Sequence, residues 1–401
     1  MQTIDKADTH PAIRPNFKTV TLLSVCHVIN DSYMNLFPPL LPFIIPALGL
    51  SVSAVGWLMT FFSVTSSLSQ LAIGYLTDRL GGRFFILLGP LVAAIFMSSI
   101  GLINNYVLMA IALSLAGLGI AAFHPPASAL VGSIAESRSG RAMSLFTLGG
   151  NLGWAVMPLL AVPLVSKFGL TATPVLAIPG LIAIALLYTL APPLSPGHPD
   201  ANSSFMSIIR VQPRVFLCLL GTVAFRSLSF FGLITFLPKF LSDHGFSPVA
   251  GGMLLSILAL SGALGGLLGG FLSDSWGRKP IIIGSLFLTV PFLNIFLLSS
   301  GWLMSLWMAL AGASLLASFS VTVVAAQEIF PDNKAVASSL ALGFGLGLGG
   351  LGVGLIGMLA DSVGLDRAIA FISFLPMVAA AFAFGLPGRR NVDKFDYGSA
   401  V

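Results

Sequence analysis

One short charged segment occurs twice in the chain, and each copy lies between two long apolar runs. The first copy spans residues 74–83, with the sequence GYLTDRLGGR, and the second spans residues 270–279, with the sequence GFLSDSWGRK. Gly74, Asp78 and Gly81 recur 196 positions later as Gly270, Asp274 and Gly277. Because this offset is close to half of the 401 residues, the repeat predicts two copies of one structural unit.

The apolar runs predict the solvent in which these units fold. Hydrophobic residues make up 56% of the chain and charged residues only 8%, whereas a soluble domain carries about 25% charged residues. A soluble fold of this size could not cover its surface with so few charges, so we expect an integral membrane protein. The runs are continuous rather than alternating, which indicates transmembrane helices of about 20 residues each.

Twelve apolar runs are long enough for such helices, six in each half. They cover approximately residues 17–46, 52–76, 84–101, 106–130, 141–166, 172–191, 213–241, 248–271, 281–299, 303–328, 334–360 and 367–387. We therefore predict an all-α membrane protein with twelve transmembrane helices in two pseudo-symmetric six-helix halves. The expected organisation is a cytoplasmic tail (1–16), an N-terminal half (17–191), a cytoplasmic linker (192–212), a C-terminal half (213–387) and a second cytoplasmic tail (388–401).

The basic residues predict the orientation of the chain, since short cytoplasmic loops are enriched in Lys and Arg. With both termini in the cytoplasm, 15 of the 19 basic residues lie on that side and three on the other, while Arg226 lies inside a helix. These residues are scattered over short loops, so the net charge of +5 does not indicate nucleic-acid binding. Cys26 and Cys218 fall inside the runs, where small apolar filler is favoured over a disulfide or a metal site.

Ionisable side chains inside the predicted helices mark the candidate site. The first helix carries His27, Asn30 and Asp31, and residues 27 and 31 share one face of the helix. Asp31 lies 13 residues after Lys18, which puts it roughly 20 Å into the membrane. A carboxylate facing lipid there costs about 2.5–3.5 kcal/mol, so we expect Asp31 to face a cavity or a partner.

Arg226 is the other charged residue that the sequence places deep in the membrane. The offset of 196 relates it to Asn30, so the two halves would hold Asp31 and Arg226 at nearly the same depth. We predict that these two charges meet between the halves and that Asp31 carries a coupled proton, since burial favours its neutral form and a nearby Arg226 its ionised form. An anionic cargo that pairs with Arg226 would release the carboxylate. The alternative is a static ion pair that holds the halves together.

Two further predicted helices carry polar residues whose role the sequence leaves open. His124 precedes two prolines in the fourth run. His27 and His124 could relay protons or bind substrate, or could form hydrogen bonds that shape a kinked helix. Gln327 and Glu328 end the tenth run, where Glu328 could contact substrate or could be an ordinary interfacial charge.

The repeated segments have a separate predicted role. Asp78 and Asp274 lie near helix ends, where each could cap backbone donors of a helix in the opposite half. Such contacts would break and reform as the halves rock, which makes the segments candidate gates; a turn fixed by glycine is a simpler role that is compatible with gating. The candidate gating residues are Gly74, Asp78, Gly81, Arg83, Gly270, Asp274, Gly277, Arg278 and Lys279.

Two six-helix halves with a Gly-x-Leu-x-Asp-x-x-Gly segment after the second and eighth helices resemble the major facilitator superfamily. A closer resemblance, to the bacterial fosmidomycin-resistance family, is carried by His27 with Asn30-Asp31, Phe123-His124-Pro125, Gly149-Gly150-Asn151 and Ala326-Gln327-Glu328. The resemblance implies a proton-linked exporter of drugs in the bacterial inner membrane. It also implies that helices 1, 4, 7 and 10, which carry these polar residues, line a central cavity.

The combined prediction is a proton-coupled secondary transporter that exports a small organic compound or drug, with an anionic compound as one option, by alternating access of the two halves. The expected proton-coupling residues are Asp31, His27 and His124, and the expected substrate-binding residues are Asn30, Arg226, His124, Gln327 and Glu328. The expected partners are a small-molecule substrate, protons and the lipid bilayer. No nucleic acid, cofactor or metal is expected, and the protein is expected to be a monomer.

Two other functions are alternatives to export. A proton-linked importer or facilitator of an organic acid or sugar would share the same fold and the same buried charges. A non-transporting membrane receptor or scaffold is less favoured, since it would need a soluble domain or a long tail. An enzyme is less favoured still, because the sequence shows no nucleophile–base pair and no cluster of metal ligands.

Overall fold

The computed structural model describes residues 17–135, 139–190, 213–330 and 345–388, together with positions 341 and 343. Within these ranges all regular structure is helical and no strand occurs, which confirms the predicted all-α class. The predicted linker 192–212 and almost all of the predicted tails, 1–16 and 388–401, lie outside the described residues.

The helices of the two halves follow one another in the order that the apolar runs predict. The N-terminal half contains α1 (Phe17–Ser32), α2 (Leu41–Leu48), α3 (Val52–Ser67), α4 (Ser69–Leu80), α5 (Gly82–Ser98), α6 (Tyr106–Ala135), α7 (Ser139–Phe168) and α8 (Ile178–Leu190). The C-terminal half contains α10 (Pro213–Asp243), α11 (Pro248–Trp276), α12 (Arg278–Leu298), α13 (Trp302–Ile329), α15 (Gly345–Val363) and α16 (Leu365–Ala383). Short 3-10 turns lie between them at η1 (Tyr33–Asn35), η2 (Pro38–Leu40), η3 (Ile100–Leu102) and η5 (Leu170–Ala177).

Ten helical segments of the described chain are long and apolar enough to cross a membrane. The remaining two predicted spans are the first, which is divided, and the eleventh, which is the shorter apolar helix α15. The first span is divided because α1 ends at Ser32 and the chain continues through η1 and η2 into α2, where Pro38 and Pro39 lack the N–H groups of an ordinary helix. The fold is the predicted arrangement of twelve helical spans.

The offset of 196 found in the sequence recurs in the backbone of the repeated segments. Gly81 and Gly277 have φ angles of 86° and 91°, a region that favours glycine. The N–H of each donates to the carbonyl four residues earlier, Thr77 or Ser273, at 2.9 and 3.0 Å. Both copies of the segment therefore end a helix by the same glycine cap, and this supports the turn role proposed for them.

The same offset relates the polar caps on both faces of the bundle. Ser51 and Ser247 begin α3 and α11, and each hydroxyl accepts a backbone N–H from the residue three positions later, at 3.1 and 3.2 Å. At the other face, Arg83 donates to the carbonyl of Tyr188, while Lys279 donates to the carbonyl of Phe384, 196 positions beyond Tyr188. A cation next to free carbonyls at a helix end is stabilising, so this contact is built into both halves.

Glycines of α15 explain how the two halves pack along one seam. A Cβ on Gly357 would lie 2.8 Å from the carbonyl oxygen of Val52, and one on Gly56 would lie 2.8 Å from the carbonyl oxygen of Val353. A Cβ on Gly354 would meet the ring of Trp57 at 2.7 Å. Only glycine allows α3 and α15 to approach this closely, which accounts for the glycine-rich eleventh run.

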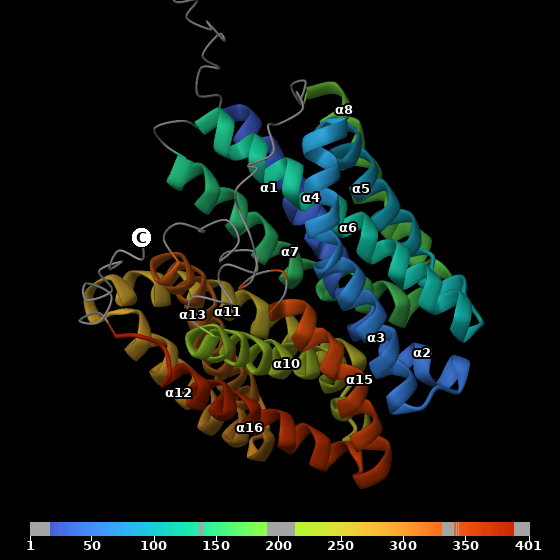
Figure 1. Cartoon of the computed structure of the whole chain (residues 1–401). Helices are drawn as coiled ribbons and strands as arrows, with labels where there is room; N and C mark the ends of the chain where they lie inside the picture. Colours follow the sequence, from blue (N-terminus) through green and yellow to red (C-terminus); the bar gives the residue numbers. More distant parts are fainter. Residues whose placement is uncertain are drawn as a thin grey trace, which may run out of the picture.

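The two halves meet at one end of the molecule. Both carboxylate oxygens of Asp361, near the end of α15, accept backbone N–H groups at the start of α3, from Val52 and Ser53, each at 3.0 Å. A second seam joins α7 and α11, where Gly252 faces Val162. Figure 1 shows the two groups of helices meeting near α3 and α15 and separating toward the ends of α4 and α13.

Candidate functional site

A triad of His27, Asp31 and His124 forms the centre of the N-terminal half. Nε2 of His27 lies 3.2 Å from one carboxylate oxygen of Asp31, and Nε2 of His124 lies 3.2 Å from the other. Asn30 donates to Asp31 at 3.0 Å. One helical turn separates residues 27 and 31 on α1, so both side chains point toward α6 and α7. The structure thus brings together four of the residues that the sequence singled out.

Close packing of α7 against α1 creates the space for this triad. A Cβ on Gly150 would lie 2.6 Å from Nε2 of His27 and 2.9 Å from a carboxylate oxygen of Asp31. Gly149 and Gly153, on either side, would meet backbone atoms of α1 at 2.5 and 2.4 Å. The small residues of the Gly149–Gly153 segment let the helices approach, and Gly150 leaves the volume that the two polar side chains fill.

The orientation of the His27 ring determines which of its nitrogens carries a proton. Nδ1 lies 2.7 Å from the backbone carbonyl oxygen of Phe146, and the two rings stack with centroids 4.0 Å apart. A carbonyl can only accept, so Nδ1 carries the hydrogen and Nε2 of a neutral ring presents a lone pair to Asp31. In that form two acceptors, Nε2 of His27 and the carboxylate of Asp31, face each other at 3.2 Å.

His124 links this buried pair to the surface of the half. Its side chain is 21% exposed, whereas those of His27 and Asp31 are each 7% exposed. The contacts of both histidines with the carboxylate are within ion-pair distance but are not aligned as hydrogen bonds. In the described part of the chain, this is the one group of three acidic, histidine or cysteine side chains whose ligand atoms all lie within 4.8 Å of one another, a spacing that could also hold a metal ion.

The predicted ion pair between Asp31 and Arg226 is not formed, which corrects the expectation that the two charges meet. The partners of Asp31 are the two histidines of its own half. Nη1 of Arg226 instead donates to the hydroxyl of Thr322 at 2.8 Å and to the carbonyl of Ser318 at 3.3 Å, both on α13. Matching depth on two related helices does not fix the direction of a side chain around each helix, and here the long arginine turns toward its own half.

Arg226 is nevertheless an unusual residue at its position. It is 1% exposed, its guanidinium lies 4.9 Å from the ring centroid of Phe319, and its Nη2 has no hydrogen-bond partner. Among the described residues no carboxylate lies within ion-pair distance of it, as the six ion pairs of the structure all involve other residues. A buried arginine whose charge is not neutralised is costly in a membrane, which marks the group as a candidate anion ligand.

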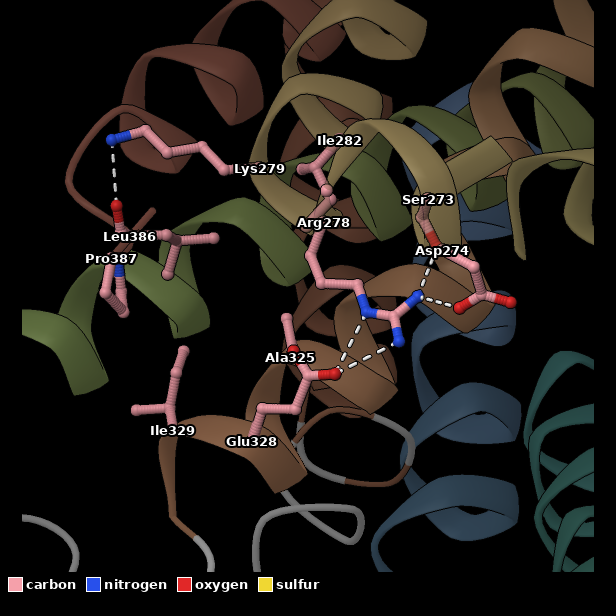
Figure 2. A pocket seen from close by; sticks show the side chains of 11 residues that line it. Ser273, Asp274, Arg278, Lys279, Ile282, Ala325, Glu328, Ile329, Leu386 and Pro387 are labelled. Carbon is pink, nitrogen blue, oxygen red and sulfur yellow. Dashed lines mark hydrogen bonds and ion pairs between the residues drawn. The ribbon is translucent and has the colours of Figure 1, made fainter. Parts of the chain in front are cut away.

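Glu328 belongs to a different cluster, at the end of the C-terminal half where the halves separate. Arg278 joins Glu328 at 3.0 Å, Asp274 at 2.5 Å and the hydroxyl of Ser273 at 2.6 Å, as Figure 2 shows. These residues line a cavity of about 220 Å³, together with Lys279 and the chain after α16. Glu328 is exposed and engaged with Arg278, so its position matches the interfacial role rather than a contact with substrate.

Comparison with known proteins identifies the family to which the chain belongs. The family model described as Major Facilitator Superfamily matches residues 23–267 and 219–396, which together span most of the chain. The chain belongs to the major facilitator superfamily. Members of this superfamily are transporters and not enzymes, so the protein is a multi-pass membrane transporter of small molecules.

Individual relatives within the superfamily support this assignment. The chain is 27% identical to the fosmidomycin resistance protein of Escherichia coli K12, over 95% of each protein. It is 28% identical to an uncharacterized MFS-type transporter, YfnC, of Bacillus subtilis 168, over 94% of this chain and 95% of the relative. The fold is similar to that of a bacterial homolog of the human lysosomal transporter Spinster, in an inward-facing and unoccupied conformation, with a TM-score of 0.73 at 20% identity over 96% of this chain and 94% of that one.

The superfamily segments that the sequence proposed as gates are only partly described. The side chain of Asp78 lies outside the described part of the structure, whereas Asp274 pairs with Arg278 in its own half. The predicted contact between Asp274 and a helix of the opposite half stays a prediction, since the contact recorded among the described residues is the one with Arg278. Gln327, beside Glu328 at the end of α13, is half-buried and lies in the same end region of this transporter.

Several residues that shape the site were not predicted from the sequence. Phe146 supplies the carbonyl that orients His27, and Thr322 holds Arg226. Neither has a signature, because a backbone carbonyl and a threonine in an apolar run are common in any superfamily member. Asp361, which joins the two halves, does have a signal, since it is an isolated acidic residue close to the end of an apolar run.

Proposed function

We propose that the protein is a proton-coupled exporter of a small organic compound that works by alternating access. The observation that carries this proposal is the orientation of His27, whose Nδ1 is committed to the carbonyl of Phe146 and whose Nε2 faces Asp31. The triad is stable when one proton lies between its acceptors and is strained when that proton leaves. A group that must gain or lose a proton in this way can couple proton movement to a change of conformation.

The proton path follows from the exposures of the triad. His124 is the most exposed member and contacts the carboxylate directly, so a proton enters at His124 and reaches Asp31 and His27. Asn30 donates to the same carboxylate and stabilises its ionised form. In this scheme Asp31, His27 and His124 carry the proton, while Asn30, His124, Gln327 and Arg226 are the proposed contacts of the cargo.

The orientation in the membrane comes from the distribution of basic residues. If both termini are cytoplasmic, the end at which the halves separate faces the cytoplasm and the end closed by Asp361 faces outward. The structure then corresponds to the inward-facing state, as does that of the Spinster homologue. Residues 17–191 rock against residues 213–387 around the site, with 192–212 as the linker between the two halves.

The direction of transport is inferred from similarity. The fosmidomycin resistance protein of Escherichia coli matches nearly the whole chain, and a transporter can confer resistance to a drug by removing it from the cell. We infer export across the inner membrane of a bacterium, by a monomer.

Replacement of Glu328 is not expected to affect cargo binding, because this residue lies in the end cluster with Arg278.

The experiment that tests proton coupling uses inverted membrane vesicles with an acidic interior and fosmidomycin as the cargo. For Asp31→Asn we expect gradient-driven uptake to fall at least about tenfold, because the amide cannot take up the shared proton, a loss of 1.4 kcal/mol or more. The matched control is Asp366→Asn, which changes an exposed carboxylate at the start of α16. Uptake by Asp31→Asn at the wild-type rate would refute the coupling role of the triad, and accumulation only in right-side-out vesicles would identify an importer.

A further inference from the structure

We propose that the cargo is an amphipathic organic monoanion, with its anionic group bound by Arg226 and its flat apolar body packed on an aromatic cluster of Trp154, Phe230 and Phe231. This inference deepens the proposed function, since it names the class of compound that the transporter carries. It starts from two independent features, a buried cation without a counter-charge and a group of aromatic rings that joins the two halves.

The first feature is the incomplete coordination of Arg226. The side chain is 1% exposed, and α13 provides it with only neutral partners, the hydroxyl of Thr322 and the carbonyl of Ser318. Its Nη2 makes no hydrogen bond. A guanidinium is always charged and presents a planar set of donors, so a carboxylate, sulfonate or phosphonate can pair with the unused edge.

The second feature is a contact between rings of α7 and α10. The ring of Trp154 lies 5.5 Å from that of Phe230 and 6.2 Å from that of Phe231, with interplanar angles of 42° and 48°. The amide of Asn35 donates to the backbone carbonyl of Trp154 at 2.7 Å and so holds this part of α7 in place. Phe230 is 8% and Phe231 3% exposed, whereas Trp154 is half-buried and keeps part of its ring surface open to a ligand.

Sequence spacing connects the two features. On α10, Arg226 and Phe230 are four residues apart and therefore share a face, about one turn or 5.4 Å along the helix. On α7, Gly150 and Trp154 have the same spacing, and Gly150 packs on the triad. The contact of Trp154 with Phe230 thus lies one helical turn from Gly150 on α7 and one helical turn from Arg226 on α10.

This arrangement predicts the charge and the shape of the cargo. Its charge is negative, because a cation would be repelled by Arg226 and a neutral compound would leave the guanidinium without a counter-charge. One negative charge suffices, since it neutralises the single charge of the guanidinium. Its body is flat or aromatic, because rings pack favourably against Trp154 and Phe230 in offset or tilted geometry.

The test measures binding to the purified full-length protein in detergent by isothermal titration calorimetry, without any gradient. The probes are 2-naphthoate, its uncharged counterpart 2-naphthamide, and acetate, which has the charge but no aromatic body. We expect 2-naphthoate to bind at least about tenfold more tightly than either of the other two, since a charge-assisted hydrogen bond in a buried site contributes about that factor.

Variants test whether Arg226 binds the anionic group and whether Trp154 binds the aromatic body. Arg226→Gln is expected to remove the difference between 2-naphthoate and 2-naphthamide, and Arg226→Lys to retain part of it because the charge is kept. Trp154→Leu is expected to weaken both naphthyl compounds together. The control is Arg367→Gln, which removes an exposed arginine at the start of α16 and should leave the preference unchanged.

The proposal is overturned if the wild type binds 2-naphthoate no more tightly than 2-naphthamide, or if a folded Arg226→Gln protein keeps the full preference. Size-exclusion profiles and thermal melts of each variant identify misfolding, and Arg226→Lys provides the comparison if Arg226→Gln does not fold. Because no pH gradient is present, the result is independent of proton coupling. Loss of coupling in Asp31→Asn together with an intact preference for the anion supports both the coupling role and the anion site. Intact coupling without the preference refutes only the anion site.

Discussion

Three side chains of its own half contact the carboxylate of Asp31, namely those of His27, Asn30 and His124. His27 is fixed by the carbonyl and ring of Phe146, and His124 completes the contact from α6. The volume for the triad exists only because position 150 has no side chain beyond hydrogen. The arrangement of the three titratable side chains therefore depends on a residue that carries no charge, Gly150.

Gly150→Ala tests this dependence. Its Cβ would come within 2.6 Å of His27 Nε2 and 2.9 Å of Asp31, so the triad must shift to accommodate it. We expect gradient-driven uptake in vesicles to fall by tenfold or more, since a displaced triad loses a contact worth about 1.4 kcal/mol. Protein levels and the melting temperature are measured in parallel.

The matched control for this substitution is Gly284→Ala on α12. A Cβ at position 284 meets nothing within 4 Å, so it should keep full transport and an equal or higher melting temperature. Equal transport by Gly150→Ala and Gly284→Ala would show that the packing around the triad does not control the activity.

The element that joins the two halves most directly is the start of α3. Asp361 from α15 accepts two backbone N–H groups of its first turn, a position at which a negative charge is favoured by the helix dipole. Ser51 accepts a third N–H of the same helix. The closed end is thus held by backbone groups and a carboxylate, in addition to the glycine packing along the seam.

Asp361→Ala is expected to loosen this end, with a cost of about 1 kcal/mol for the lost cap. The measurement is labelling of Thr60→Cys by a membrane-impermeant maleimide in a background without native cysteines, since Thr60 is 2% exposed within the seam. We expect labelling several times faster than with Asp361 present. Asp366→Ala, at the same end but outside the seam, should leave the labelling rate unchanged, and equal rates in all three proteins would contradict the role of Asp361.

At the scale of the whole molecule, the fold was largely predictable and the partners of the buried charges were not. The apolar runs and the offset of 196 predicted twelve spans, and the same offset recurs in the glycine and serine caps. The repeat relates α1, which carries Asp31, to α10, which carries Arg226, but the partners of the two charges depend on how α6, α7 and α13 pack. Rotation about a helix axis is set by tertiary contacts, and no local pattern encodes it.

Alternating access makes a prediction about the whole molecule. Cysteines at Ser53 and Asp361, joined by a short bifunctional crosslinker, would replace the hydrogen bonds across the seam by a covalent link. We expect the linked protein to lose vesicle transport almost completely while it still binds 2-naphthoate from the separated end. The uncrosslinked double variant is the control, and undiminished transport after complete crosslinking would contradict rocking of the halves.

The contact of Asp361 also has no counterpart on the other side of the pseudo-twofold axis. The position related to it by 196 residues is Val165, and the helix start it would cap begins with Pro248, which lacks an N–H. Among the described residues, the α3–α15 seam therefore has a polar latch that the α7–α11 seam lacks. When this closed end opens, we expect the α7–α11 seam to part first and the latched α3–α15 seam to part last, rather than both seams opening evenly.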